Sequence, residues 1–310
     1  MVPETDRLPD VLPTPRLSAS GRPVPEIRAD LRRISDGRNA LTVVSCWAQA
    51  IAVIAGAAWI DRWWVWPIAV ILMGRSFALL NILGHEAAHR LLFTRKGLND
   101  AVGRWILAYP AFVPLDIYRR SHMAHHRDEM GPEEPDLGLY AGYPITRASF
   151  RRKLTRDATG NSGWKNLKGL LRAATKPSSR RIALPILAMQ VVLAALFALA
   201  GRPELYLVCW LLPWMTSWRV INRLRAIAEH GGMTRSPDRR QTTHHVRQSL
   251  LARFWMVPYH TGWHLAHHVD SGLPWRNLPK LHAELEAAGW ITPDLEWPSY
   301  TALWKALSAG

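Results

Sequence analysis

The residues best suited to chemistry are nine histidines, eight of which fall into three short clusters. The clusters are HEAAH at residues 85–89, HMAHH at 122–126 and HLAHH at 264–268, and the ninth histidine is His230 in AEHGG. Residues three and four apart share one face of a helix, so each cluster can direct its imidazoles toward one point. Neutral imidazole is a ligand of iron, zinc and copper. We therefore predict a metal site built from histidines on several helices.

The number of imidazoles indicates two metal ions. One ion takes roughly four to six ligands, so nine nitrogens suit a dinuclear site better than a single ion. Carboxylate-bridged dimetal bundles use two Glu-x-x-His motifs, whereas this chain has one, from Glu86 to His89. We therefore expect acidic side chains to support the ligands from behind. The acidic candidates are Glu86, Asp128, Glu229 and Asp270, and His260 is a further candidate for this supporting role.

Four apolar stretches are candidates for membrane spans. They cover about residues 41–60, 64–84, 182–201 and 205–221. A span needs about 20 apolar residues, so the fourth stretch must continue as a helix or kink at Pro213. Arg75 interrupts the second stretch and is expected to face protein or water. Segment 105–115 is too short to span and contains two prolines, which favours an interfacial or re-entrant segment.

The distribution of charge predicts the topology. The formal net charge is +15, and of the 39 Lys and Arg only Arg62 and Arg202 fall in the two short loops between paired spans. Cytoplasmic loops carry the excess of positive residues. An all-α integral-membrane fold with four transmembrane helices then places both termini and all nine histidines in the cytoplasm. Within a membrane domain of residues 39–310, residues 85–181 and 222–310 would form a helical cap that holds the dimetal site.

Residues 1–38 are rich in Pro and Arg and contain no apolar run of the kind found in signal peptides. We expect them to form a flexible basic tail. The basic residues are not interleaved with aromatic residues in a soluble module, so nucleic acid is not expected as a partner. The two cysteines, Cys46 and Cys209, form no CxxC pair, so the sequence suggests neither a disulfide framework nor a thiolate zinc site.

The order of HEAAH, HMAHH, EH and HLAHH on four spans resembles the integral-membrane fatty acid desaturase and hydroxylase superfamily. The resemblance extends from about residue 41 to about residue 285 and includes PDL after the second cluster and NLPKLH after the third. It implies a non-haem di-iron centre under a cytoplasmic cap and an acyl channel between the spans. It also implies that O2 and two external electrons provide an oxidant for an unactivated C–H bond.

The resemblance further implies which residues hold the two iron ions. The ligands would be His85, His89, His122, His125, His126, His230, His264, His267 and His268. Some members have an asparagine four residues before the lone histidine, where this chain has Ala226, and this separates it from the animal-type acyl-CoA desaturases. No HPGG motif of a fused haem-binding domain is present. Electrons are therefore expected from a separate ferredoxin- or cytochrome-type donor with its reductase.

The expected function is desaturation of a fatty acyl chain or related lipid by a multi-pass membrane enzyme of lipid metabolism. Hydroxylation of a lipid or alkyl group is the nearest alternative, because substrate position rather than any motif decides between the two outcomes. HEAAH also fits the HExxH pattern of zinc proteases, which would leave the other two clusters unused. A non-enzymatic metal carrier usually needs polar groups within its spans, and here these offer little beyond Arg75.

Four histidines lie outside the nine. His260 stands one helical turn before His264 and is included among the supporting candidates. The other three are His244, His245 and His282, and we expect them to be surface or capping residues.

Overall fold

The structure, a computed structural model, describes residues 1–310, which divide into two compact units. The histidine unit comprises residues 1–34, 119–150 and 223–310, and it contains seven of the nine predicted ligands. The apolar-helix unit comprises residues 35–118 and 151–222 and contains His85 and His89.

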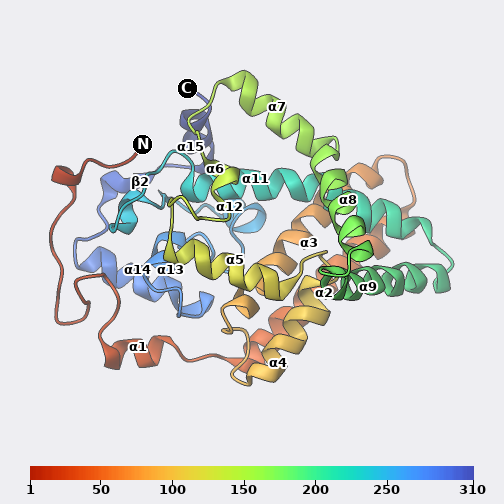
Figure 1. The fold of residues 1–310 in the computed structure, drawn as a ribbon, viewed down its shortest axis with the longest axis horizontal. Coiled ribbons are helices and arrows are strands. Elements are labelled where there is room, and N and C mark those ends of the chain that lie inside the picture. Colours follow the sequence, from red (N-terminus) through yellow and green to blue (C-terminus); the bar gives the residue numbers. More distant parts are fainter. The chain divides into compact units, whose positions relative to one another are not determined.

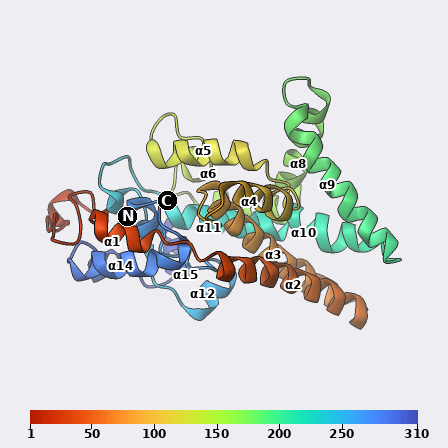
Figure 2. The same ribbon diagram turned by 90° about the horizontal axis from the view of Figure 1, so that it is seen from below.

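The apolar-helix unit is helical (Figures 1 and 2). Its elements are α2 (Asp36–Ile60), α3 (Val65–Ala88), α4 (Lys96–Ala101), the π-helix η2 (Val102–Ala108), α8 (Asn161–Thr175), α9 (Arg180–Leu199), the π-helix η3 (Tyr206–Leu211) and α10 (Leu212–Met215). Helices α5 (Leu115–Arg127), α7 (Arg147–Ala158) and α11 (Ser217–His230) contain residues of both units. By length and composition α2, α3 and α9 could cross a membrane, which agrees with the first three predicted spans.

Helix α3 is the central helix of this unit. Of the most apolar stretch of α3, 61% is buried within the chain. The corresponding share is 22% for α2 and 17% for α9, so most of the apolar stretch of those two helices is not buried by the protein. Gly74 of α3 lies against Ser217, whose hydroxyl donates a 2.7 Å hydrogen bond to the carbonyl of Val70. A Cβ at position 74 would lie 2.3 Å from that hydroxyl oxygen. The absence of a side chain therefore allows this close approach.

The polar interruptions of the first two spans have partners within the unit. The guanidinium of Arg75 donates a 2.9 Å hydrogen bond to the side-chain carbonyl of Gln49 on α2, so the mid-span arginine faces protein, as predicted. Helix α2 ends at Asp61, whose left-handed backbone (φ 44°, ψ 47°) lets its N–H reach the carbonyl of Ala57. The loop that follows leads into α3, which packs beside α2 (Figure 2).

The proline-containing segment before α5 is buried and irregular. It begins in η2 and turns at Phe112, where φ is 61°. The carbonyl of Tyr109 accepts a 2.7 Å hydrogen bond from the side chain of Gln190. The carbonyl of Pro110 accepts a 3.1 Å hydrogen bond from the indole of Trp210. Irregular backbone at membrane depth needs such partners inside the protein, so these contacts fit the re-entrant interpretation.

The predicted fourth span is not one continuous helix. Elements η3 and α10 cover residues 206–215, Thr216 departs from helical geometry (φ −119°, ψ −89°), and α11 begins at Ser217. The break lies three residues after Pro213, because proline is tolerated in the first turn of α10, where its missing N–H is not needed. The N–H of Thr216 still reaches the carbonyl of Leu212 at 3.0 Å. A fourth crossing stays a prediction, since neither piece is long enough alone.

The histidine unit consists of short helices and one two-stranded ladder. Its elements are η1 (Thr5–Arg7), α1 (Pro25–Leu31), α6 (Leu137–Tyr140), η4 (Arg239–Gln241), β1 (His245–Val246), α12 (Leu250–Trp255), α13 (His264–Val269), η5 (Trp275–Asn277), α14 (Leu278–Ala287), η6 (Pro293–Leu295), β2 (Glu296–Trp297) and α15 (Tyr300–Leu307). The strands pair in parallel, with His245 opposite Glu296. Helix α13 packs beside α14 (Figure 1). A core that includes Ile227, Val246 and Leu303 joins α11, the ladder and α15.

The N-terminal segment 1–34, expected as part of a flexible tail, is packed against the C-terminal segment of the same unit. Arg28 forms a bidentate ion pair with Asp270 at 2.5 and 2.9 Å. Arg16 forms a second bidentate pair with Glu284 at 2.6 and 2.7 Å. The expectation of a flexible basic tail did not anticipate these pairs, because the acidic partners lie more than 240 positions away in the sequence.

Candidate metal centre

Three helices position the seven histidines of the histidine unit. Six of the seven side chains are buried, and that of His126 is half-buried. Helix α5 carries His122, His125 and His126, α11 ends at His230, and α13 carries His264, His267 and His268. The i, i+3 and i, i+4 spacing places the imidazoles of each helix on one face, as predicted.

Four of these imidazoles converge through their Nε2 atoms. The Nε2 atom of His264 lies 3.1 Å from that of His230 and 3.1 Å from that of His268. The Nε2 atom of His268 lies 3.4 Å from that of His125. A ring nitrogen carries either one proton or one lone pair, so it cannot satisfy two such neighbours by well-aligned hydrogen bonds. A shared cation would satisfy all four.

The opposite ring edges show where the protons lie. The Nδ1 atom of His230 donates a 2.9 Å hydrogen bond to the carbonyl of Thr242. The Nδ1 atom of His125 contacts the carboxylate of Glu134 in a very short hydrogen bond. A proton held on Nδ1 leaves the lone pair on Nε2, so these partners fix the tautomer that can bind a metal.

Glu129 is a fully enclosed carboxylate beside these histidines, with no exposed side-chain surface. Its Oε2 atom lies 3.1 Å from Nδ1 of His268, and its Oε1 atom lies 3.4 Å from Nδ1 of His230. The carboxylate also accepts a hydrogen bond from the guanidinium of Arg239 and one of 2.7 Å from the hydroxyl of Thr243. This buried charge is therefore held by several partners and faces two imidazoles.

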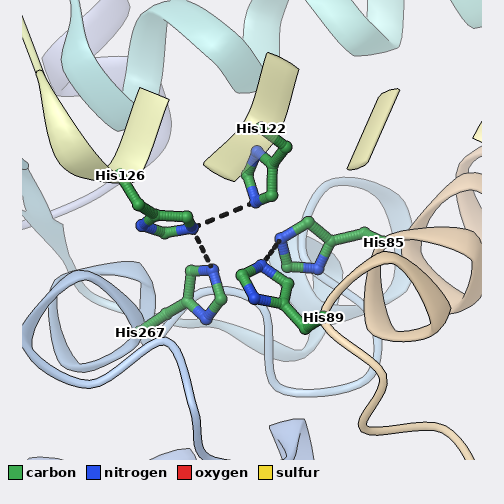
Figure 3. Close-up of side chains that lie close together, drawn as sticks. All are labelled: His85, His89, His122, His126 and His267. Carbon is green, nitrogen blue, oxygen red and sulfur yellow. Dashed lines mark hydrogen bonds between the residues drawn. The ribbon is translucent and has the colours of Figure 1, made fainter. Parts of the chain in front are cut away.

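A second group comprises His122, His126 and His267 (Figure 3). The Nε2 atom of His126 lies 3.1 Å from that of His122 and 3.1 Å from that of His267. Within the apolar-helix unit, His85 stands at the end of α3 and His89 caps it, and their Nε2 atoms are 3.2 Å apart. Figure 3 shows the nitrogens facing one another within the pair and within the trio.

These spacings match those around a transition-metal ion. With a metal–nitrogen distance of about 2.1 Å, neighbouring ligand nitrogens lie about 3.0 Å apart at 90° and about 3.4 Å apart at the tetrahedral angle. The Nε2–Nε2 contacts within the two groups range from 3.1 to 3.4 Å. A donor set made of imidazole suits iron, zinc or copper and does not suit the oxygen-seeking Mg²⁺ or Ca²⁺. The residues present therefore fit iron.

Burial keeps three of the four converging rings in the metal-binding form. Burial, helped by neighbouring imidazoles, holds the pKa values of His264 and His268 well below the ordinary histidine value. Burial and the charge of His125 also lower the pKa of His230. At His125 burial opposes protonation, but the hydrogen bond and charge of Glu134 outweigh it and raise the pKa. Neutral imidazole is the form that binds metal ions.

Three of the four predicted supporting carboxylates, Asp128, Asp270 and Glu229, pair with arginines. Asp128 accepts a 2.7 Å hydrogen bond from Arg235, and Asp270 is held by Arg28 as described above. Glu86, which follows His85 in the HEAAH cluster, is buried, with 2% of its surface exposed.

Of the other two supporting candidates, Glu229 lies near His264, whereas His260 contacts tryptophan rings. Glu229 accepts a 2.7 Å hydrogen bond from Arg225, and its carboxylate lies 3.7 Å from Nδ1 of His264. His260 is half-buried, with its ring centroid 5.3 Å from that of Trp263. Sequence reasoning missed Glu129 and Glu134. Both belong to the run of acidic residues in the loop directly after HMAHH, and this run could have indicated them. Only Asp128 of this run was predicted to support the ligands.

The remaining histidines are buried. His244 donates a 2.7 Å hydrogen bond to the carbonyl of Gly231, just past the end of α11, which is the predicted capping role. The expectation of a surface or capping residue was wrong for His245 and His282, which are 8% and 5% exposed and pack against each other. The chain folds its C-terminal segment over them, which local spacing does not reveal.

Comparison with known proteins places these residues in a family context. The sequence model described as fatty acid desaturase matches residues 61–296, which include all nine histidines. The dihydrorhizobitoxine desaturase of Bradyrhizobium elkanii is 29% identical over 255 residues, 75% of this chain and 72% of that protein. The sn-1 oleoyl-lipid 12-desaturase of Anabaena variabilis is 26% identical over 192 residues, 54% of this chain and 53% of that protein. The sn-1 acyl-lipid omega-3 desaturase (ferredoxin) of Nostoc sp. is 29% identical over 97 residues, 31% of this chain and 26% of that protein.

Proposed function

Since the chain belongs to the fatty acid desaturase family and is an oxidoreductase, we propose that it acts as a membrane-bound, O2-dependent di-iron desaturase. Its substrate would be a fatty acyl chain or a related molecule. The observation that carries the proposal is the convergence of imidazole Nε2 atoms from α5, α11 and α13 inside the region matched by the family. Family membership also favours this function over an HExxH protease or a metal carrier.

The nine histidines would hold two iron ions. The first ion would take His125, His230, His264 and His268, and the second would take His122, His126 and His267 together with His85 and His89. The Nε2 spacings within the groups support this division. The resemblance of HEAAH to the first histidine cluster of the superfamily supports the inclusion of the last two.

When bound, the iron pair would supply the power to reduce O2 and to remove hydrogen from an unactivated C–H bond. Desaturation consumes O2, two electrons and two protons and transfers two substrate hydrogens, so that two water molecules leave. The protein would hold the imidazoles in place for this chemistry. Glu134 and the Thr242 carbonyl would fix the tautomers of His125 and His230. Glu129 would place a negative charge beside His230 and His268. Burial keeps bulk water from the rings.

The proposal includes a topology and an electron donor. Helices α2, α3 and α9 would cross the membrane, and residues 205–221 would form the fourth crossing, which leaves both termini and the histidines in the cytoplasm. The bias of positive residues supports this orientation. A separate ferredoxin- or cytochrome-type donor would deliver electrons, and the ferredoxin in the name of the Nostoc relative supports a donor of the first type.

The test is product analysis in cells that express the full chain with an electron-donor system. Both lipid and polar extracts need analysis, because the relatives are named for acyl lipids and for dihydrorhizobitoxine. The wild type should yield products two hydrogens lighter than their precursors, and His125→Ala should yield none. Met123→Ala changes an exposed position of the same helix and should retain activity. Hydroxylated products without new double bonds would contradict desaturation, and an active His125→Ala variant would contradict the ligand assignment.

A further inference from the structure

A further pair of buried histidines lies outside the nine predicted ligands, within the histidine unit. His245 is in β1 and His282 is in α14, and their ring centroids are 4.7 Å apart with the planes tilted by 40°. Glu286 stands one helical turn after His282. One ligand atom of each of these three residues lies within 4.8 Å of the other two.

Carboxylates approach the two imidazoles from different elements. The Nε2 atom of His282 lies 3.3 Å from Oε1 of Glu286, its i+4 neighbour on α14. The Nε2 atom of His245 lies 3.9 Å from Oε1 of Glu296, its register partner in the β1–β2 ladder. The cluster therefore gathers two imidazoles and two carboxylates from a helix and two strands.

Hydrogen bonding does not account for this cluster. The Nδ1 atom of His282 is buried and has no hydrogen-bond partner. Burial lowers the pKa of both His245 and His282 to about 4, so both rings are neutral at pH 7 and their lone pairs are available. The nitrogens that face the two carboxylates are the Nε2 atoms, so these, rather than Nδ1, are the candidate ligand atoms.

We propose that His245, His282 and Glu286 bind a divalent transition-metal ion, zinc in the first instance, with Glu296 or water as the fourth ligand. Histidine nitrogen and carboxylate oxygen are ligands of tetrahedral zinc sites. At zinc–ligand distances of about 2.0 Å, tetrahedral ligand atoms lie about 3.3 Å apart, which matches the separation between His282 and Glu286. The carboxylate of Glu286 would offset part of the charge of the ion, whereas that of Glu296 also pairs with Arg247 at 2.7 Å.

The ion would have a structural role. It would fasten α14 to β1, and through Glu296 to β2, so it would connect the segment after α11 with the C-terminal segment. The carboxylate of Glu286 is 54% exposed, which gives the ion a route from solvent. This inference does not depend on the proposed desaturase activity, since none of its ligands belongs to the nine histidines.

The test is zinc content of the full-length protein, purified in detergent, incubated with Zn²⁺ and freed of unbound metal. The wild type should hold about one more zinc per chain than His282→Ala or Glu286→Gln, because both variants remove a ligand. Glu284→Gln is the matched control, since it removes the same charge two positions away on the same helix. It should keep the zinc, and iron content should be equal in all four proteins.

Equal zinc content in the wild type and Glu286→Gln would overturn the proposal. An equal loss of zinc in Glu284→Gln would also overturn it, because the effect would then be one of general charge. Glu286 is exposed, so its variant decides the matter even if His282→Ala fails to fold. Product analysis and iron content report separately on the proposed activity.

Discussion

The Oε2 atom of Glu129 lies 3.1 Å from Nδ1 of His268, on the ring edge opposite the nitrogen that faces His264. Neither side chain has exposed surface. A carboxylate from the loop after α5 is thus placed behind a histidine of α13. Such a partner orients the ring and raises its basicity as a ligand.

Glu129→Gln should weaken metal binding without removing a ligand. Loss of an outer carboxylate typically lowers metal affinity by about 10–100-fold. Iron content after dialysis against a weak chelator measures this change. Asp128→Asn is the control, because Asp128 pairs with Arg235 and should leave iron binding near the wild-type value. Greater loss of iron in Asp128→Asn than in Glu129→Gln would show that the adjacent carboxylate is the supporting one.

Arg28→Ala should destabilise the histidine unit. The variant leaves the carboxylate of Asp270, which is 2% exposed, without its bidentate partner. We expect a loss of about 1–3 kcal/mol in the free energy of unfolding, below the value for a fully buried pair because Arg28 is partly exposed. Arg16→Ala breaks an exposed pair and should change stability little. Equal melting temperatures of the two variants would contradict this role for the N-terminal segment.

Gly74→Ala should disrupt the packing of α3. The added Cβ would lie 2.3 Å from the hydroxyl oxygen of Ser217, and displacement of the neighbouring helix should cost about 1–3 kcal/mol. At Gly56 of α2 a Cβ meets no atom within 4 Å, so Gly56→Ala should be neutral or stabilise the helix by up to about 1 kcal/mol. Thermal unfolding in detergent measures both. The prediction fails if Gly74→Ala is as stable as Gly56→Ala.

His244 should make stability depend on pH. Burial lowers its pKa to about 4, whereas the unfolded chain has the ordinary value of about 6.5. Between these values only the unfolded state binds the proton, so the contribution is complete above pH 6.5 and is lost as the pH falls toward 4. His244→Gln keeps a donor for the Gly231 carbonyl but does not titrate. The free energy of unfolding of this variant should change less between pH 6.5 and 4 than that of the wild type, by up to roughly 3 kcal/mol. Melting temperatures measured across this pH range test this. An equal fall in both proteins would contradict the role of His244.

Local spacing made the histidine clusters predictable. His264, His267 and His268 lie on one short helix, and their approach to one another follows from helical periodicity. The apolar runs of α2, α3 and α9 were likewise readable from composition. The order of the clusters then pointed to the family that matches residues 61–296.

Contacts between distant segments were not predictable in this way. Glu129 contacts His268 across more than 130 positions, and Arg28 meets Asp270 across 242. The burial of His282 depends on the return of the C-terminal segment to β1. Backbone breaks such as Thr216 depend on how a helix packs, so an apolar run alone does not reveal them.

The most direct test of the central claim is the iron content of the full-length protein purified in detergent after expression with iron supplied. The wild-type chain should hold about two iron ions, since nine imidazoles suffice for two ions. Both His125→Ala and His267→Ala should show a clear loss of iron, because each variant removes one ligand from one of the two groups. A wild-type chain that takes up zinc alone, or variants that keep the full iron content, would contradict the account.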